Sequence, residues 1–193
     1  MDAIVIAGGI PQPKDALYKE TQGGYKTLLD IAGKPMVQWV VDALNQAEKV
    51  DSILLVGLPI FSEIRSDKPL IPVEDHHDLL ANIQAGIKRL REIHPAANKV
   101  LVVSGDIPAI QSNMVDWCID RILESDEDVY YNVIERSAME KRFPGSKRTY
   151  TPLKDVEVCG GDINGMSVSI VDNQTGLWEH LIEARKSSLR QAS

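Results

Sequence analysis

Short runs of β-branched and aliphatic residues alternate along this chain with segments of helical periodicity, and this alternation constrains the fold most strongly. Strands are expected at residues 2–7, 52–57, 100–104, 129–133, 156–158 and 167–171. Helices are expected from Met36, Asp78, Ser112 and near Thr175, with Asp78 and Ser112 as the capping residues of their helices. Such alternation is typical of a parallel sheet covered on both faces. We therefore predict an α/β fold, a three-layer α/β/α arrangement around a mostly parallel, doubly wound sheet.

The length of the chain favours one domain spanning residues 1–193. A chain of 193 residues with 44% hydrophobic content can bury one sizeable core and is short for two. The least regular stretches are residues 8–24, 58–73 and 136–154. The last expected helix reaches residue 193 without a terminating signal, so the natural chain is expected to continue.

Composition excludes several function classes. A net charge of -7 argues against nucleic acid as a partner, because nucleic-acid binding needs a basic surface. Cys118 and Cys159 lie far apart and outside any C-x-x-C motif, which favours two reduced thiols. No apolar run is long enough to span a bilayer, and Asp2 stands where a signal peptide would be basic. A soluble, cytoplasmic protein is expected.

The first strand breaks directly into two glycines, in the run Ile4-Val5-Ile6-Ala7-Gly8-Gly9. Backbone without side chains lets an anion approach the N–H groups, and Lys26 and Lys34 follow after a polar loop. The run matches neither the G-x-G-x-x-G fingerprint nor the P-loop. A small phosphorylated ligand is the expected partner.

This run, together with Lys26 and Gly33-Lys34-Pro35-Met36, resembles the N-terminal signature of nucleotidyltransferases with a glycosyltransferase-A-like fold, and most closely the MobA-like NTP transferases. The resemblance implies that Ala7, Gly8 and Gly9 wrap the nucleotide and that Lys26 contacts phosphate oxygens. The arginine that follows the glycines in the family is absent here. Either Lys14 or Lys19 replaces it, or the triphosphate is held less firmly, because lysine lacks the guanidinium fork.

The most apolar expected strand ends in Ser104-Gly105-Asp106-Ile107-Pro108, which resembles the metal-binding aspartate of the family. Oxygen ligands at a strand end suit Mg²⁺, which takes one or two carboxylates plus substrate phosphates. Asp106 is therefore expected to bind Mg²⁺ and, with Lys26, to serve catalysis, while Ser104 and Gly105 adjoin the nucleotide. In the alternative interpretation, Asp106 merely caps the loop before the next helix.

A second glycine-rich segment, residues 159–165, carries Asp162 and Asn164. The family resemblance implies that Asp162 completes the metal site and that Asn164 faces the acceptor. A tight turn explains the same residue types equally well.

Two further segments have open interpretations. Residues 74–78 contain adjacent histidines, but a loop that caps the next helix explains them better than a metal site. By resemblance, this loop and Asn82 adjoin the nucleotide base. The basic residues 141–148 could attract a phosphorylated acceptor, while a solvated loop or a homodimer contact explains them equally well.

These features together favour a Mg²⁺-dependent nucleotidyltransferase that moves NMP from an NTP to a small phosphorylated acceptor, of the molybdopterin or sugar-phosphate type, and releases pyrophosphate. One alternative is a glycosyltransferase that uses a nucleotide sugar, although the D-x-D motif lacks its first acid in Ser104-Gly105-Asp106. Another is a non-catalytic nucleotide-binding domain, which the missing arginine favours.

Overall fold

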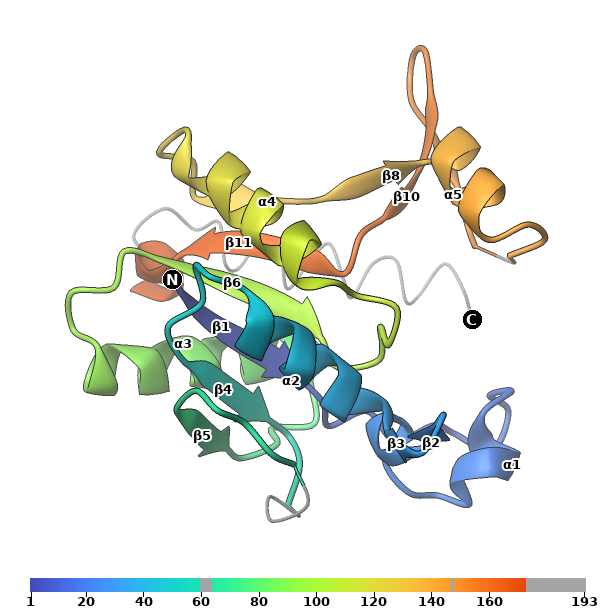
Figure 1. The fold of residues 1–193 in the computed structure, drawn as a ribbon, viewed down its shortest axis with the longest axis horizontal. Helices are drawn as coiled ribbons and strands as arrows, with labels where there is room; N and C mark the ends of the chain where they lie inside the picture. Colours follow the sequence, from blue (N-terminus) through green and yellow to red (C-terminus); the bar gives the residue numbers. More distant parts are fainter. Residues whose placement is uncertain (60–63, 147, 173–193) are drawn as a thin grey trace.

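A six-stranded sheet with helices on both faces forms the centre of the molecule (Figure 1). The computed structural model describes residues 1–59, 64–146 and 148–172. The strand order is β5-β4-β1-β6-β11-β7, with the following bounds: β1 Asp2–Ile6, β4 Ile53–Val56, β5 Leu70–Val73, β6 Lys99–Ser104, β7 Val129–Tyr130 and β11 Ile163–Ser167. Strands β5, β4, β1 and β6 are parallel, whereas β11 and β7 join by antiparallel pairing. The predicted fold class is confirmed.

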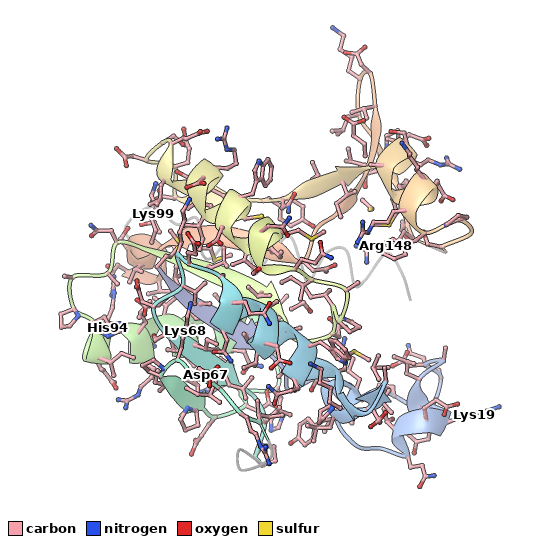
Figure 2. The ribbon with its side chains drawn as sticks, viewed as in Figure 1. Lys19, Asp67, Lys68, His94, Lys99 and Arg148 are labelled. Carbon is pink, nitrogen blue, oxygen red and sulfur yellow. The ribbon has the colours of Figure 1, made fainter. Side chains whose placement is uncertain are left out.

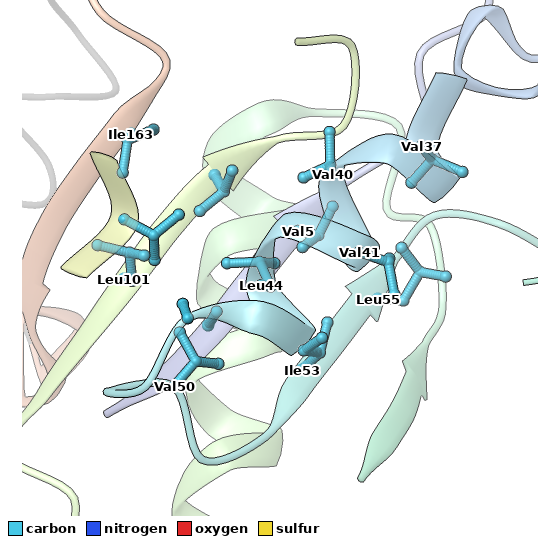
Figure 3. Close-up of a cluster of buried hydrophobic side chains, with 14 of the residues drawn as sticks. Val5, Val37, Val40, Val41, Leu44, Val50, Ile53, Leu55, Leu101 and Ile163 are labelled. Atoms are coloured by element: carbon cyan, nitrogen blue, oxygen red, sulfur yellow. The ribbon is translucent and has the colours of Figure 1, made fainter. Parts of the chain in front are cut away.

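Alternating strand residues divide the core between the two faces of the sheet. Val5 and Leu101 pack in one cluster with helix α2 (Met36–Gln46) and helix α4 (Ser112–Leu123), as Figure 3 shows. Ile4 packs on the other face with helix α3 (Leu79–Ile93). Each large aliphatic side chain that is fully buried contributes about 1.5–3 kcal/mol. The clusters therefore hold the central strands rigidly in place.

The first turns of helices α3 and α4 differ in whether a side chain caps them. Asp78 caps α3 as predicted, because its carboxylate accepts the N–H groups of Leu80 and Ala81. Ser112 was expected to cap α4, and this is wrong. Gln111 occupies the cap position without a side-chain hydrogen bond, and Ser112 is the first helical residue.

Smaller elements flank the central sheet. A three-stranded sheet in the order β8-β10-β9, with helix α5, projects beyond α4 (Figure 1). The remaining bounds are α1 Tyr18–Thr21, η1 Lys26–Leu28, β2 Asp30–Ile31, β3 Lys34–Pro35, β8 Val133–Glu135, α5 Arg136–Arg142, β9 Thr151–Pro152, β10 Glu157–Gly160 and η2 Val168–Asp172. In the part of the chain that the structure describes, no helix is long and apolar enough to cross a membrane.

The predicted strand at residues 167–171 is wrong. Residues 168–172 form the 3₁₀ helix η2, and strand β11 lies earlier, over residues that we interpreted as a glycine-rich turn. The physical reason lies at Gly165, where an added Cβ would stand 2.5 Å from Cδ1 of Ile122 on α4. This glycine permits close helix packing rather than a turn.

Other expected boundaries also shift. The strand expected at residues 129–133 divides into β7 and β8, which belong to different sheets. Strand β5 and helix α5 occur in stretches that we expected to be irregular. The helix expected from Thr175 lies outside the described residues.

Candidate active site

The carboxyl ends of β1 and β6 lie side by side, which is where open α/β sheets bind ligands. The Gly105 N–H donates to the Ile6 carbonyl at 2.9 Å, so the segments that follow β1 and β6 begin side by side. The Ser104 N–H donates to the Asp162 carbonyl at 2.9 Å. The backbone therefore brings the first glycine segment, the Asp106 segment and the segment of Asp162 to one edge of the sheet.

The first glycine segment crosses the end of β4 at very short range. A Cβ on Gly57 would lie 2.5 Å from the Gly8 Cα, and Gly57 has a φ of +97°. Both positions therefore require glycine. Within the described residues, the N–H groups of Gly8 and Gly9 have no hydrogen-bond acceptor, so both are open donors for an anion. Sequence reasoning missed Gly57, although its place at the end of a predicted strand was a usable signal.

Two hydrogen bonds position Lys26 beside this glycine segment, one from its own backbone and one from the side chain of Thr27. Its N–H donates to the Gly9 carbonyl at 3.0 Å, and the fully buried Thr27 donates its hydroxyl to the Ala7 carbonyl at 2.7 Å. The Lys26 ammonium lies 2.5 Å from Oδ2 of Asp106. Residues 80 positions apart thus form one ion pair. Sequence reasoning gave Thr27 no role, although it directly follows Lys26.

Both carboxylate oxygens of Asp106 have partners. Lys26 binds one oxygen, and the Ser104 hydroxyl donates to the other. Burial opposes ionisation of Asp106, but the hydrogen bonds from Lys26 and Ser104 outweigh it and hold the pKa of the carboxyl below its usual value. The side chains of Lys26 and Asp106 remain 34% and 28% exposed. A charged pair is therefore accessible to a small ligand.

Asp106 carries an accessible carboxylate that suits a magnesium ion arriving with phosphates, whereas the expected contribution of Asp162 to a metal site stays a prediction. Asp162 reaches this edge through its backbone, but its carboxylate pairs with Arg148 at 3.4 Å. Across the described ranges, no group of three histidine, cysteine or acidic side chains could hold a metal. One or two carboxylates suffice for Mg²⁺ when phosphate oxygens and water complete the shell.

Asn82 is buried and reaches the glycine segment indirectly. Its side chain donates to Oδ1 of Asp75 at 2.9 Å and accepts the His76 N–H at 2.7 Å. Asp75 in turn lies against Gly8, where an added Cβ would be 2.9 Å from the carboxylate carbon. Asn82 therefore holds residues 74–78 beside the glycine segment, and its contact with a nucleotide stays a prediction. Asp75 was not singled out by sequence reasoning.

Asn164 joins two strands instead of projecting freely. Its Oδ1 accepts the Asn132 N–H at 2.8 Å, and its amide donates to the Gly161 carbonyl at 3.4 Å. These bonds hold the chain between β7 and β8 against β11. Its contact with an acceptor also stays a prediction.

The structure does not bring Lys14 or Lys19 to the ion pair of Lys26 and Asp106. Both side chains are exposed, and neither contacts another described residue through a hydrogen bond or ion pair. Figure 2 shows Lys19 pointing outward from α1, away from the rest of the molecule. In this conformation, neither lysine occupies the place beside the phosphates that the resemblance assigns to the arginine of the family.

Residues 3–165 match the family of the MobA-like NTP transferase domain. The chain belongs to this family. It is 32% identical over 103 residues to a probable molybdenum cofactor guanylyltransferase of Thermococcus kodakarensis, which covers 53% of this chain and 48% of that protein. It is 23% identical over 104 residues to a 2-C-methyl-D-erythritol 4-phosphate cytidylyltransferase of Prochlorococcus marinus, with 51% and 45% covered. The chain thus matches about half the length of these MobA-like and cytidylyltransferase relatives.

Solved structures agree on the fold. A hypothetical transferase from Thermus thermophilus superimposes with a TM-score of 0.77 and 28% identity, covering 99% of this chain and 75% of that one. A CMP:2-keto-3-deoxy-manno-octonic acid synthetase complexed with CTP superimposes with a TM-score of 0.63 and 18% identity, covering 99% and 86%. At that identity, the second likeness shows a shared fold alone.

Proposed function

We propose that this chain transfers a nucleotidyl group from an NTP to a small phosphorylated acceptor and releases pyrophosphate. The observation that carries the proposal is the ion pair of Lys26 and Asp106, which lies beside the open N–H donors of Gly8 and Gly9. Relatives with the names guanylyltransferase and cytidylyltransferase support the same reaction class.

The ion pair explains how the site could change when a triphosphate arrives. The triphosphate would accept hydrogen bonds from the glycine segment and draw the Lys26 ammonium toward its oxygens. The Asp106 carboxylate would then be free of its cation and would hold Mg²⁺. The ion, when bound, supplies positive charge to the transferring and leaving phosphates.

The site needs no strong general base under this proposal. A phosphate acceptor is already ionised near neutral pH, so the residues have to align two anions and neutralise their charge. Lys26 and the glycine N–H groups supply this neutralisation from the protein. The proposal does not require a nucleophilic side chain.

Calorimetric titration with GTP, CTP, ATP and UTP in the presence of MgCl₂ tests nucleotide binding. We expect at least one NTP to bind, and Lys26→Ala to weaken that binding. Lys88→Ala, an exposed lysine on α3, is the matched control and should bind like the wild type. The absence of binding for all four nucleotides would refute the proposal, as would unchanged affinity in Lys26→Ala.

Pyrophosphate release tests the reaction itself. The NTP that binds is incubated with MgCl₂ and a panel of small phosphorylated acceptors, and release should require both substrates. Binding without release from any acceptor would favour the non-catalytic nucleotide-binding alternative. Release of a nucleoside diphosphate from a nucleotide sugar would favour the glycosyltransferase alternative.

A further inference from the structure

A cavity of about 810 Å³ opens directly beside the candidate site. Ile107 and Pro108, which follow Asp106 in the chain, line this cavity, as does Asp162. Most of the other lining residues come from helix α4, strand β8, helix α5 and the segment that follows α5. The volume lies within the range of small-molecule sites, which is about 300–1,000 Å³.

Apolar side chains line most of this cavity. Met114 and Trp117 come from α4, Ile134 from β8, and Met139 from α5, while Phe143 follows α5. Trp117 is 57% exposed and Phe143 is 44% exposed. Large aromatic groups left open to solvent around a cavity indicate a surface that a ligand covers.

Two arginines add positive charge to this apolar wall. Arg148 donates to the Gly160 carbonyl at 2.6 Å and faces Asp162, which leaves further N–H donors of its guanidinium group for a ligand. Arg142 lies 5.6 Å from the centre of the Phe143 ring, and no described carboxylate forms an ion pair with it. An unneutralised arginine in an apolar cavity favours an anionic ligand group, and its planar fork suits phosphate.

Arg148 connects the cavity wall to the edge of the sheet where Asp106 lies. Arg148 pairs with Asp162, whose carbonyl accepts the Ser104 N–H two residues before Asp106. In Figure 2, the Arg148 side chain lies on the side of α5 that faces the body of the molecule. Through Asp162, Arg148 therefore adjoins the segment that leads into Asp106.

We propose that this cavity binds the acceptor of the reaction, and that the acceptor is a monophosphate on a largely apolar, ring-shaped body. This inference rests on the proposed nucleotidyl transfer. A polyhydroxylated sugar phosphate fits less well, because its hydroxyl groups would lose water against apolar walls. Uncharged polar side chains are few in the lining: Asn113, Asn132 and Ser146.

The test uses 1-naphthyl phosphate as the probe, with glucose 1-phosphate and 1-naphthol as comparison ligands. Calorimetry on the wild-type chain without nucleotide should show 1-naphthyl phosphate binding about tenfold or more tightly than either comparison ligand, since only it combines a ring with a phosphate. Equal or tighter binding of glucose 1-phosphate would overturn the proposal. Failure of 1-naphthyl phosphate to bind, or equal binding of 1-naphthol, would also overturn it.

Two variants locate the binding. Arg142→Gln should weaken 1-naphthyl phosphate binding about fivefold or more, because the phosphate loses a charged partner. Arg89→Gln, an arginine on α3 that pairs with Glu92 at 2.6 Å, is the control and should bind normally. Ala138→Trp places a large side chain in the cavity from exposed Ala138 and should abolish binding without depending on Arg142. Normal binding in a folded Arg142→Gln or Ala138→Trp variant would overturn the proposal.

The nucleotide titration keeps this proposal separate from the proposed function. If an NTP binds through Lys26 and 1-naphthyl phosphate does not bind, the acceptor class is wrong and nucleotidyl transfer stands. If 1-naphthyl phosphate binds and no NTP does, nucleotidyl transfer is refuted, and the role of the cavity as an acceptor site is refuted with it.

Discussion

The ion pair of Lys26 and Asp106 contributes little to the stability of the fold. An ion pair whose side chains are about one-third exposed typically stabilises a protein by about 0–1 kcal/mol. The surrounding backbone nevertheless positions both residues closely, through Thr27 on one side and Gly105 on the other. The residues are therefore better explained by ligand chemistry than by stability.

Asp106→Asn is expected to reduce turnover on the order of a hundredfold or more while changing the unfolding free energy by about 1 kcal/mol or less. The amide keeps the shape of the carboxylate but not the charge that would hold Mg²⁺. Thermal melting and pyrophosphate release should be measured on one preparation. Asp126→Asn, on an exposed aspartate, is the control. Retained activity in Asp106→Asn, or inactivity that follows from unfolding, would contradict the metal assignment.

Asp75 provides a prediction about acid stability. Burial opposes its ionisation, but hydrogen bonds from Asn82 and His77, together with the nearby imidazole of His77, hold the pKa of the carboxyl below its usual value. A pKa that is lower in the folded state contributes stability above the unfolded value of about 3.9, and this stability is lost as the pH falls through the folded value. Wild-type stability should therefore fall more steeply below about pH 4 than that of Asp75→Asn.

Urea unfolding between about pH 6 and pH 2.5 measures this difference. The slope of the unfolding free energy against pH reports the protons that the chain takes up on unfolding. Asp67→Asn, in which an exposed aspartate is replaced, should keep the wild-type pH dependence. Identical slopes in wild type and Asp75→Asn would mean that Asp75 does not carry the effect.

At the scale of elements, the sequence predicted the strands that are buried on both faces of the sheet and the helices that bury one face against it. Strands β1, β4 and β6 each contain a run of at least four apolar residues, and helices α2, α3 and α4 each bury an apolar face. Strand β11 was misplaced because its one glycine, Gly165, permits close packing of α4, which local sequence does not reveal. Strand β5 and helix α5 were missed because they are short, and α5 is largely exposed.

The crossing of β4 with the glycine segment gives a prediction at this scale. Gly57→Ala should lower the unfolding free energy by about 1–3 kcal/mol or more and weaken NTP binding, because the new Cβ needs both a strained φ and space that Gly8 occupies. Gly23→Ala is the matched control, since Gly23 has a φ of +85° with nothing within 4 Å. The control carries the backbone strain without the collision. Equal effects of the two substitutions on NTP binding would show that the crossing does not shape the site.

At the scale of the whole molecule, the sequence located the centre of the candidate site but not its surroundings. Gly8, Gly9, Lys26 and Asp106 meet at one edge of the sheet, because parallel strands end together. Thr27, Gly57 and Asp75 support that edge, although sequence reasoning gave none of the three an individual role. The apolar cavity forms between α4 and α5, so it depends on tertiary packing that periodicity alone cannot supply.

The opposite end of the sheet is built for stability. Asp2 is buried there, accepts the Ser52 hydroxyl at 2.6 Å and lies 3.0 Å from Nδ1 of His94. In Figure 2, His94 and Arg148 lie toward opposite sides of the molecule. Amino ends of parallel strands serve the fold, while carboxyl ends face ligands. Stability and binding should therefore respond to different substitutions.

Ser52→Ala is expected to lower the unfolding free energy by about 1–3 kcal/mol, because it leaves a buried carboxylate with one donor fewer, and to leave NTP affinity unchanged. Lys26→Ala should do the reverse, changing stability by about 1 kcal/mol or less while weakening NTP binding about tenfold or more. Urea unfolding and calorimetry on both variants measure the two quantities. If Ser52→Ala weakened NTP binding as much as Lys26→Ala does, the two ends of the sheet would be coupled, and the division between them would be wrong.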